Sequence, residues 1–236
     1  MKTPLSLNQF RKKATLLVAL LGTAIFFNAC KNDIDNTTPA IAALSVVNAF
    51  PNANTLNFYI GNAQVNNTGI AFGEKLSYLN AYEGSRVFDV AFTGSSTSLL
   101  SKAQTLKGGM YHTVYIVGKT TADLEYLLVT DSLTVPKEGE VNLRFMNLSP
   151  DAPALSLERA SDTTKFDNKA FKAYTKFKPL TAAKSNFILR NKETNAVLAT
   201  LDDVELVKGR IYTVWAKGLV AGTDATTKLA IKVSEH

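Results

Sequence analysis

The stretch LSVVNAFPNANTLNFYI, residues 44–60, recurs in the chain as LRFMNLSPDAPALSLER, residues 143–159. A second pair follows it in the same order, GMYHTVYIVG at 109–118 and GRIYTVWAKG at 209–218. The offsets are nearly constant, at 99 residues (143 minus 44) for the first pair and 100 (209 minus 109) for the second. Two matched segments at constant spacing predict a duplicated module of roughly 95 residues, the size of a common domain.

Each copy has the patterns of β-structure. VNLRFMN, residues 141–147, alternates apolar with polar side chains, which indicates a strand with one buried face. YHTVYIVG and YTVWAKG are rich in aromatic and β-branched residues, and PNAN and PDAP carry turn chemistry. We therefore predict an all-β protein of two tandem antiparallel β-sandwiches, immunoglobulin-like or transthyretin-like. The boundary falls in VPKEGE (135–140), giving modules at 42–135 and 136–236.

The N-terminus has the pattern of an export signal. Four basic residues and no acidic residue precede Cys30, and residues 14–27 form an uncharged run. That run is shorter than the ~20 apolar residues needed to span a membrane. It fits the apolar core of a secretory signal peptide. We predict a signal peptide over residues 1–29.

Cys30 is the only cysteine of the chain and follows Ala29 directly. This arrangement resembles the lipoprotein signal of Bacteroidetes-type bacteria, although Phe27 and Asn28 stand where Leu and a small residue are usual. The resemblance implies acylation of Cys30, and two buried acyl chains at ~0.8 kcal/mol per methylene anchor a protein stably. Residues 30–41 would then be the lipidated cysteine and a flexible tether. The alternative is an ordinary signal peptide followed by an unmodified cysteine.

The basic charge of the chain lies mostly in the predicted signal. The whole chain carries 26 Lys and Arg against 20 Asp and Glu, and removing four basic residues leaves 22 against 20, or +2. This balance gives no argument for a nucleic-acid partner. The charged residues Lys31, Asp33 and Asp35 weakly resemble a tag for the outer face of the outer membrane. We expect an outer-membrane, cell-surface location, with the periplasmic face as the alternative.

The order of the motifs resembles a known family. N-x-x-P-[DN]-A occurs at 48–53 and 147–152. Each copy is followed by a strand of the type G-x-x-Y-T-V-x-x-x-G, in which His112 replaces the tyrosine in the first copy. This combination resembles the bacterial domain of unknown function 4397 (DUF4397) over residues 42–236. The resemblance implies a sandwich-like extracytoplasmic domain, often in tandem, and no established activity.

No catalytic or metal-binding pattern is apparent. His112 has no second interior histidine and no thiol to join it, and the matched position in the second copy is Tyr212. Asp151, Asp203 and Asp224 are scattered, whereas calcium needs clustered oxygen ligands. We predict no catalytic residue, no metal and no cofactor, and expect a protein that is not an enzyme.

The most unusual composition is TKFDNKAFKAYTKFK, residues 164–178, where lysines interleave with aromatic residues. The lysine spacing favours a short amphipathic helix. One interpretation places the aromatic rings in the core with solvated lysine stems around them. The other is an anion-facing patch for acidic glycan or lipopolysaccharide. Trp215 is either core packing or a binding platform. The candidate ligand surface comprises Lys165, Lys169, Phe171, Lys172, Tyr174 and Trp215.

These expectations combine into one functional hypothesis. The protein is a non-enzymatic, membrane-anchored envelope lipoprotein whose two modules bind or interact at the cell surface, in an adhesion-like or assembly role. The alternative is a glycan-binding accessory of a polysaccharide uptake system. The expected partners are the membrane, through the lipid, and a glycan or an envelope protein, with no nucleic acid. Hydrolase activity would require carboxylates that meet in a cleft.

Overall fold

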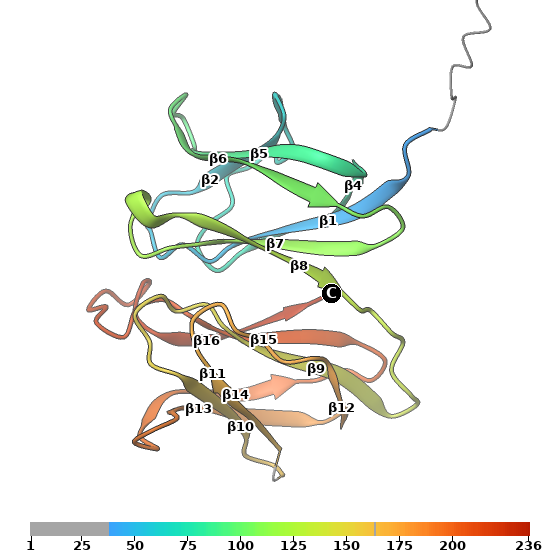
Figure 1. Ribbon diagram of the computed structural model, residues 1–236. Helices are drawn as coiled ribbons and strands as arrows, with labels where there is room; N and C mark the ends of the chain where they lie inside the picture. The colour runs from blue at the N-terminus through green and yellow to red at the C-terminus, as the bar shows by residue number, and fades with distance from the viewer. Residues whose placement is uncertain (1–37, 163) are drawn as a thin grey trace, which may run out of the picture. The chain divides into compact units, whose positions relative to one another are not determined.

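A computed structural model describes residues 38–162 and 164–236 (Figure 1). The predicted signal peptide and Cys30 lie outside these residues. Residues 39–236 form one compact unit. Its regular structure is β-strand apart from one 3-10 turn at Thr121–Asp123. In the described part of the chain, no helix is long and apolar enough to cross a membrane.

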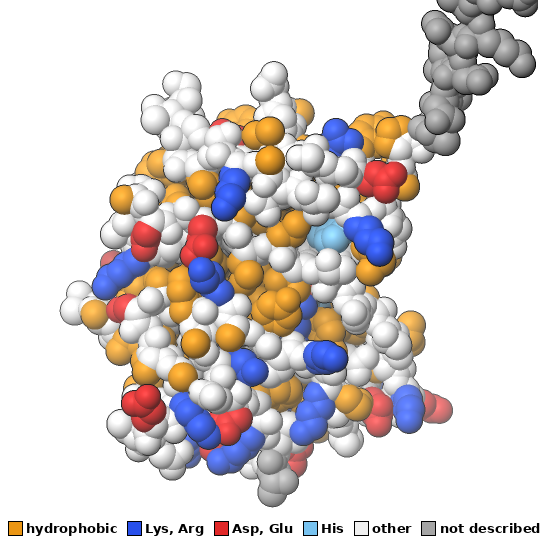
Figure 2. Space-filling view, in the orientation of Figure 1, with side chains coloured by type: hydrophobic (Ala, Val, Ile, Leu, Met, Phe, Trp, Pro, Cys, Tyr) orange, Lys and Arg blue, Asp and Glu red, His pale blue; other side chains and the backbone are white. Residues whose placement is uncertain are grey.

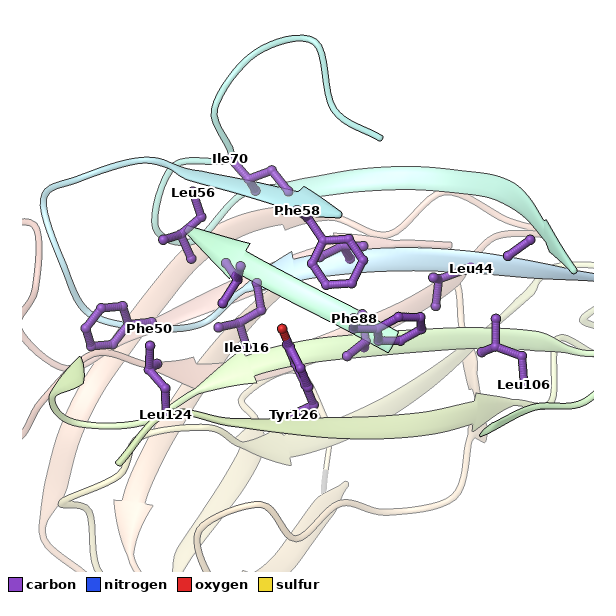
Figure 3. Close-up of a cluster of buried hydrophobic side chains, with 14 of the residues drawn as sticks. Leu44, Phe50, Leu56, Phe58, Ile70, Phe88, Leu106, Ile116, Leu124 and Tyr126 are labelled. Carbon is purple, nitrogen blue, oxygen red and sulfur yellow. The ribbon is translucent and has the colours of Figure 1, made fainter. Parts of the chain in front are cut away.

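The first half of this unit is a sandwich of two four-stranded sheets, ordered β4-β1-β7-β8 and β3-β2-β5-β6. Phe58, Phe88 and Tyr126 meet edge to face between these sheets, with ring centroids 5.2 to 6.2 Å apart, in the core that Figure 3 shows. The strands are β1 Ile41–Asn48, β2 Leu56–Ile60, β3 Ala63–Gln64, β4 Lys75–Tyr82, β5 Gly84–Phe92, β6 Ser98–Leu106, β7 Tyr111–Val117 and β8 Glu125–Asp131.

The second half repeats the arrangement, with sheets ordered β12-β9-β15-β16 and β11-β10-β13-β14. Even the register is repeated, since Leu44 lies opposite His112 between β1 and β7, and Leu143 lies opposite Tyr212 between β9 and β15. The predicted duplication therefore extends to the pairing of the strands. The strands are β9 Glu140–Asn147, β10 Leu155–Arg159, β11 Lys165–Lys169, β12 Lys178–Thr181, β13 Lys184–Asn191, β14 Val197–Glu205, β15 Ile211–Lys217 and β16 Ala230–Glu235.

The prediction of an all-β fold with two sandwiches is confirmed, with one correction to its strand directions. The pairs β1–β7 and β9–β15 are parallel, whereas wholly antiparallel sheets were expected. Parallel pairs need a long crossover connection and occur where both faces of the sheet are covered. Here the chain between β1 and β7 passes through strands of the opposite sheet. In the sheet orders, each parallel pair occupies the two central positions of its sheet.

A buried asparagine explains the repeated N-x-x-P motif. Asn48 accepts a hydrogen bond from the backbone N–H of Phe50 (3.1 Å) and donates one to the carbonyl of Ile70 (2.9 Å). In the second copy Asn147 accepts from the N–H of Ser149 (3.1 Å) and donates to the carbonyl of Lys169 (3.0 Å). One amide side chain thus satisfies backbone groups on both sides of the turn. It ties the end of the first strand to the loop that returns from the opposite sheet.

The sheet β4-β1-β7-β8 of the first sandwich packs face to face with the sheet β12-β9-β15-β16 of the second, and we call these two the inner sheets. Each sandwich has its own apolar core, and a third cluster joins them, built on Val47, Tyr115, Met146 and Trp215 with smaller apolar residues around them. We call this contact the module interface. In β15, Val214 faces the core of its own sandwich while Trp215 faces the module interface. The central strands therefore have no solvent face.

This packing contradicts the candidate role of Trp215 as a binding platform. Its side chain is 0% exposed, and its Nε1–H donates to Ser234 Oγ at 3.1 Å. The short amphipathic helix that the lysine spacing allowed within residues 164–178 is not formed. Lys165–Lys169 is strand β11, paired with β10, and β12 begins at Lys178 and pairs with β9. Pairing with distant strands overrides a spacing that would favour a helix in isolation.

Replacing the interface tryptophan tests this packing. We expect Trp215→Ala to lower the free energy of unfolding by about 3–5 kcal/mol, because a large buried ring leaves a cavity between two sheets. Val135→Ala is the matched control, since Val135 is 82% exposed; its effect should stay within about 0.5 kcal/mol. Urea unfolding followed by circular dichroism measures both. Equal, small losses would contradict a buried Trp215.

Candidate ligand site at the module interface

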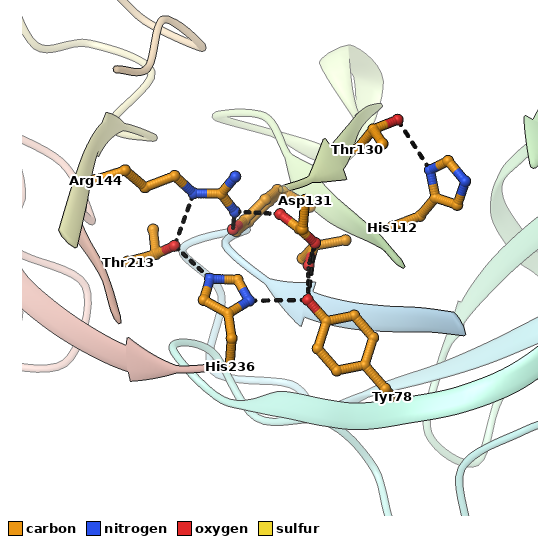
Figure 4. A network of polar contacts seen from close by, with 9 residues as sticks. Tyr78, His112, Thr130, Asp131, Arg144, Thr213 and His236 are labelled. Atoms are coloured by element: carbon orange, nitrogen blue, oxygen red, sulfur yellow. Dashed lines mark hydrogen bonds and ion pairs between the residues drawn. The ribbon is translucent and has the colours of Figure 1, made fainter. Parts of the chain in front are cut away.

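A buried ion pair crosses the module interface. Asp131 ends β8 of the first sandwich, and Arg144 lies in the middle of β9 of the second. Arg144 Nη2 is 2.6 Å from Asp131 Oδ1, and the two side chains are 3% and 0% exposed. Figure 4 shows this pair at the centre of a network of polar contacts. Charges so deeply buried must be paired and hydrogen-bonded, because their desolvation is costly.

The remaining contacts of Arg144 hold its guanidinium group in place. Its Nε donates to Thr213 Oγ1 at 2.8 Å and its Nη2 to the Tyr115 hydroxyl at 3.1 Å. The guanidinium carbon also lies 4.7 Å from the ring centroid of Phe177. Burial opposes the charge of Arg144, but the Tyr115 hydroxyl and the Asp131 carboxylate raise its pKa. The group therefore remains a fixed cation.

His236 completes the network, and its neighbours determine its protonation. Tyr78 donates its hydroxyl hydrogen to Asp131 Oδ2 at 2.8 Å, so His236 Nδ1, 2.8 Å from the same hydroxyl, must donate to it. Thr213 Oγ1 accepts from Arg144 and lies 2.7 Å from His236 Nε2, to which it donates. A neutral imidazole with its hydrogen on Nδ1 thus satisfies every one of these groups.

Burial reinforces this assignment. The pKa of His236 is lowered from 6.5 to about 4, and burial is the main cause; the negative charge of Asp131 opposes this shift, and the positive charges of Arg144 and Lys75 add to it. The pKa of Tyr78 moves the other way, raised first by burial and then by the negative charge of Asp131. At neutral pH the network therefore holds one carboxylate, one guanidinium, a neutral imidazole and a neutral phenol.

A pocket opens beside this network. Its volume is about 380 Å³, within the range of ligand-binding cavities. The lining comes from the end of β8, the linker after it, strand β9 and the loop before β12. It includes two cations and no carboxylate. The lining residues are Thr130, Ser132, Thr134, Asn142, Arg144, Tyr174, Thr175, Lys176 and Phe177.

The residues of the predicted ligand surface are dispersed in the structure. Lys165 pairs with Glu158 at 2.6 Å and Lys172 with Glu125 at 2.8 Å, so neither presents a free charge. In Figure 2, Lys and Arg side chains on the visible face are interspersed with Asp and Glu. Charges of mixed sign do not form the continuous anion-facing patch that the lysine spacing suggested.

The other predicted residues have separate positions. Lys169 is half-buried at the end of β11, and Phe171 packs against the module interface. Only Tyr174, which is 43% exposed, lies at the pocket. The structure therefore brings one of the six predicted surface residues to this site.

Arg144 is the site residue that sequence patterns missed. In VNLRFMN it alternates with apolar residues, which is the pattern of a side chain that points to solvent. Its partner Asp131 lies in the other module, so no local spacing connects them. The comparison of the two copies offers one signal, since Arg144 stands where the first copy has the small, uncharged Ser45.

The remaining polar candidates have structural contacts. His112 is buried; its Nε2 contacts the backbone of Lys107 at 3.1 Å and its Nδ1 the Thr130 hydroxyl at 3.2 Å. Asp151 accepts hydrogen bonds from the backbone N–H groups of Val220 and Ala221, at 2.8 and 3.2 Å. Among the residues that the structure describes, no three His, Cys, Asp or Glu side chains gather as a metal site would require.

The ion pair can be tested by removing one charge. We expect Asp131→Asn to lower the free energy of unfolding by about 3–5 kcal/mol, because Arg144 is left buried without its partner. Lys165→Gln is the control, since its ion pair with Glu158 is half exposed, and it should cost less than about 1 kcal/mol. Chemical unfolding of both variants provides the comparison. Similar losses would show that Asp131 and Arg144 are hydrated.

His236 predicts a dependence of stability on pH. Its pKa is about 4 when folded and 6.5 otherwise, so between these values the unfolded chain binds a proton that the folded chain does not. The contribution of His236 is therefore complete above about pH 6.5 and is lost as the pH falls to 4, by up to about 3 kcal/mol. His236→Gln should flatten this part of the curve. Parallel curves for the two proteins from pH 7 to 4 would refute the assignment.

Comparison with known proteins identifies one family and several remote structural likenesses. No curated protein matches the sequence. A carbohydrate-binding module of family CBM26 from Eubacterium rectale Amy13K, solved with maltoheptaose, is 9% identical with a TM-score of 0.26, covering 83% of this chain and 97% of its own. The fimbrial anchor protein Mfa2 from Porphyromonas gingivalis is 10% identical with a TM-score of 0.23, covering 84% and 98%.

A third solved structure, described as a putative adhesin from Bacteroides ovatus, is 10% identical with a TM-score of 0.21 and covers 83% of this chain and 94% of its own. The family match is to the sequence itself. Residues 42–158 match the model described as Domain of unknown function (DUF4397), from the start of β1 into β10. Through these residues, which contain the repeated strand and the linker between the sandwiches, the chain belongs to the DUF4397 family.

Proposed function

We propose that this protein is a non-enzymatic envelope lipoprotein that binds a polar partner at the cell surface, through the pocket beside the module interface. The observation that carries the proposal is the fixed cation in that pocket. Arg144 is held by Asp131, Thr213 and Tyr115, which are all groups of the protein itself. A binding group that is already ordered loses little conformational entropy when its ligand arrives, which favours affinity.

The groups around the pocket favour binding over catalysis. None of the lining residues is a His, Cys, Asp or Glu. The nearby imidazole of His236 has both ring nitrogens in contact with protein hydroxyls, those of Tyr78 and Thr213. A general acid or base must reach a substrate proton directly or through one water. Asp131 and Arg144 instead hold each other across the module interface.

The anchor in this proposal is the lipid on Cys30. Ten residues, 31–40, separate Cys30 from strand β1. A chain of that length reaches at most about 35 Å when extended. The two sandwiches would then act close to the outer membrane, in an adhesion-like or assembly role.

A second candidate function is that of a glycan-binding accessory to polysaccharide uptake. The observation in its favour is the rim of the pocket. Tyr174 is 43% exposed there, and Ser132 and Thr134 line the same pocket. An exposed aromatic ring beside hydroxyl groups suits a sugar, which has both apolar and polar faces.

Protease treatment of intact cells tests the proposed location. We expect the protein to be degraded on intact cells, while a periplasmic protein in the same cells is spared. Cys30→Ser should move the protein from the membrane fraction to the soluble fraction, because the acyl chains supply its membrane affinity. Protection on intact cells with degradation after lysis would place the modules in the periplasm. Membrane retention of the Cys30→Ser variant would overturn the lipid anchor.

A further inference from the structure

We infer that the pocket beside the module interface is an anion site that binds the carboxylate of an acidic saccharide, of the uronic-acid class. This inference rests on the proposed function and specifies its ligand. It depends on three features of the described residues: an unpartnered nitrogen on Arg144, an unpaired lysine on the pocket wall, and hydroxyl and aromatic side chains around them.

The first feature is Arg144 Nη1. The other two guanidinium nitrogens contact Thr213, Tyr115 and Asp131. Among the described residues Nη1 has no hydrogen-bond partner, and Figure 4 shows it directed away from Thr213 and Asp131. The Arg144 side chain is only 3% exposed, and it lines the pocket. Asp131 Oδ1, and not Arg144 Nη1, is the buried side-chain atom that lacks a hydrogen bond among the described residues, so Nη1 is accessible from the pocket. A guanidinium N–H in that position can donate a charge-assisted hydrogen bond to a ligand oxygen.

The second feature is Lys176. It lines the same pocket, is exposed, and makes no ion pair within the described part of the chain. By contrast, the neighbouring Lys172 is paired with Glu125. Asp131 balances the charge of Arg144, so Lys176 leaves the pocket with a net positive charge. Two nitrogen donors, one fixed and one flexible, can bind the two oxygens of one carboxylate.

The third feature selects a saccharide among carboxylates. Ser132 and Thr134 line the pocket on the linker side, and Tyr174 stands at its rim with 43% of its surface exposed. Hydroxyl side chains both donate and accept, as sugar hydroxyls do. A pyranose ring also offers an apolar face to an aromatic ring. A pocket of about 380 Å³ has room for a sugar residue.

Calorimetric titration of the full-length protein in detergent tests the inference with oligogalacturonate as the probe. We expect it to bind, with affinity that falls as salt is added. Lys176→Gln should weaken binding about tenfold, because one charge-assisted hydrogen bond is lost. Lys178→Gln, a nearby lysine outside the pocket, is the matched control and should bind as the wild type does. Methyl-esterified oligogalacturonate, which keeps the shape but loses the charge, should bind weakly to all three proteins.

Other outcomes would overturn the inference. Equal binding of the acidic and the esterified oligosaccharide would remove the anion site while supporting a neutral glycan. Equally tight binding of glucose 6-phosphate would show a general anion site without selection of an acidic sugar. No binding, or no effect of Lys176→Gln, would also refute it. None of these results alters the protease test of the proposed function. The inference about the acidic ligand and the proposal of a cell-surface lipoprotein can therefore fail independently.

Discussion

The packing of the two inner sheets against each other is the constraint on which the rest of this structure depends. It covers the second face of the parallel pairs β1–β7 and β9–β15, so any polar side chain on that face must find its partners inside the protein. Asp131 and Arg144 are such side chains: they pair with each other, and the Thr113 and Thr213 hydroxyls form hydrogen bonds with them. The candidate site follows from this, because the contacts that hold Nε and Nη2 of Arg144 also fix the side chain at the wall of a pocket.

The sequence contained enough to predict the sandwiches but not their contact. The repeat and the alternation of apolar and polar residues in 141–147 identify strands, because such alternation distinguishes a buried face from a solvent-exposed one. Alternation loses its meaning where both faces are buried. Arg144 therefore has the pattern of a surface residue although it is 2% exposed, and Trp215 could be assigned to neither face. The asparagine turns were predictable as turns, but their tie to a distant loop depends on the topology.

The loop after the repeated Ala-Phe pair shows how the fold imposes a conformation on unequal residues. Gly73 in the first copy and Lys172 in the second both have positive φ, 87° and 67°, and both donate their N–H to the motif asparagine's carbonyl at 2.8 Å. The left-handed conformation costs a non-glycine residue roughly 1–2 kcal/mol. The ion pair of Lys172 with Glu125 is about 40% exposed and stabilises the folded state by less than about 1 kcal/mol. The hydrogen bond to Asn147, and not the charge, therefore determines the shape of the loop.

The duplication also has a consequence for stoichiometry. The module interface contains matched positions of the two copies, such as Tyr115 and Trp215. In the interface of a two-fold dimer, identical halves must carry identical residues at such positions. In one continuous chain they are free to differ: Arg144 corresponds to Ser45, and His236 takes the place beside Ile211 that Asp131 takes beside Tyr111. Only one of the two related positions therefore carries a guanidinium group. The first sandwich therefore has no counterpart of Arg144, and we expect the proposed anion site to bind one ligand per chain.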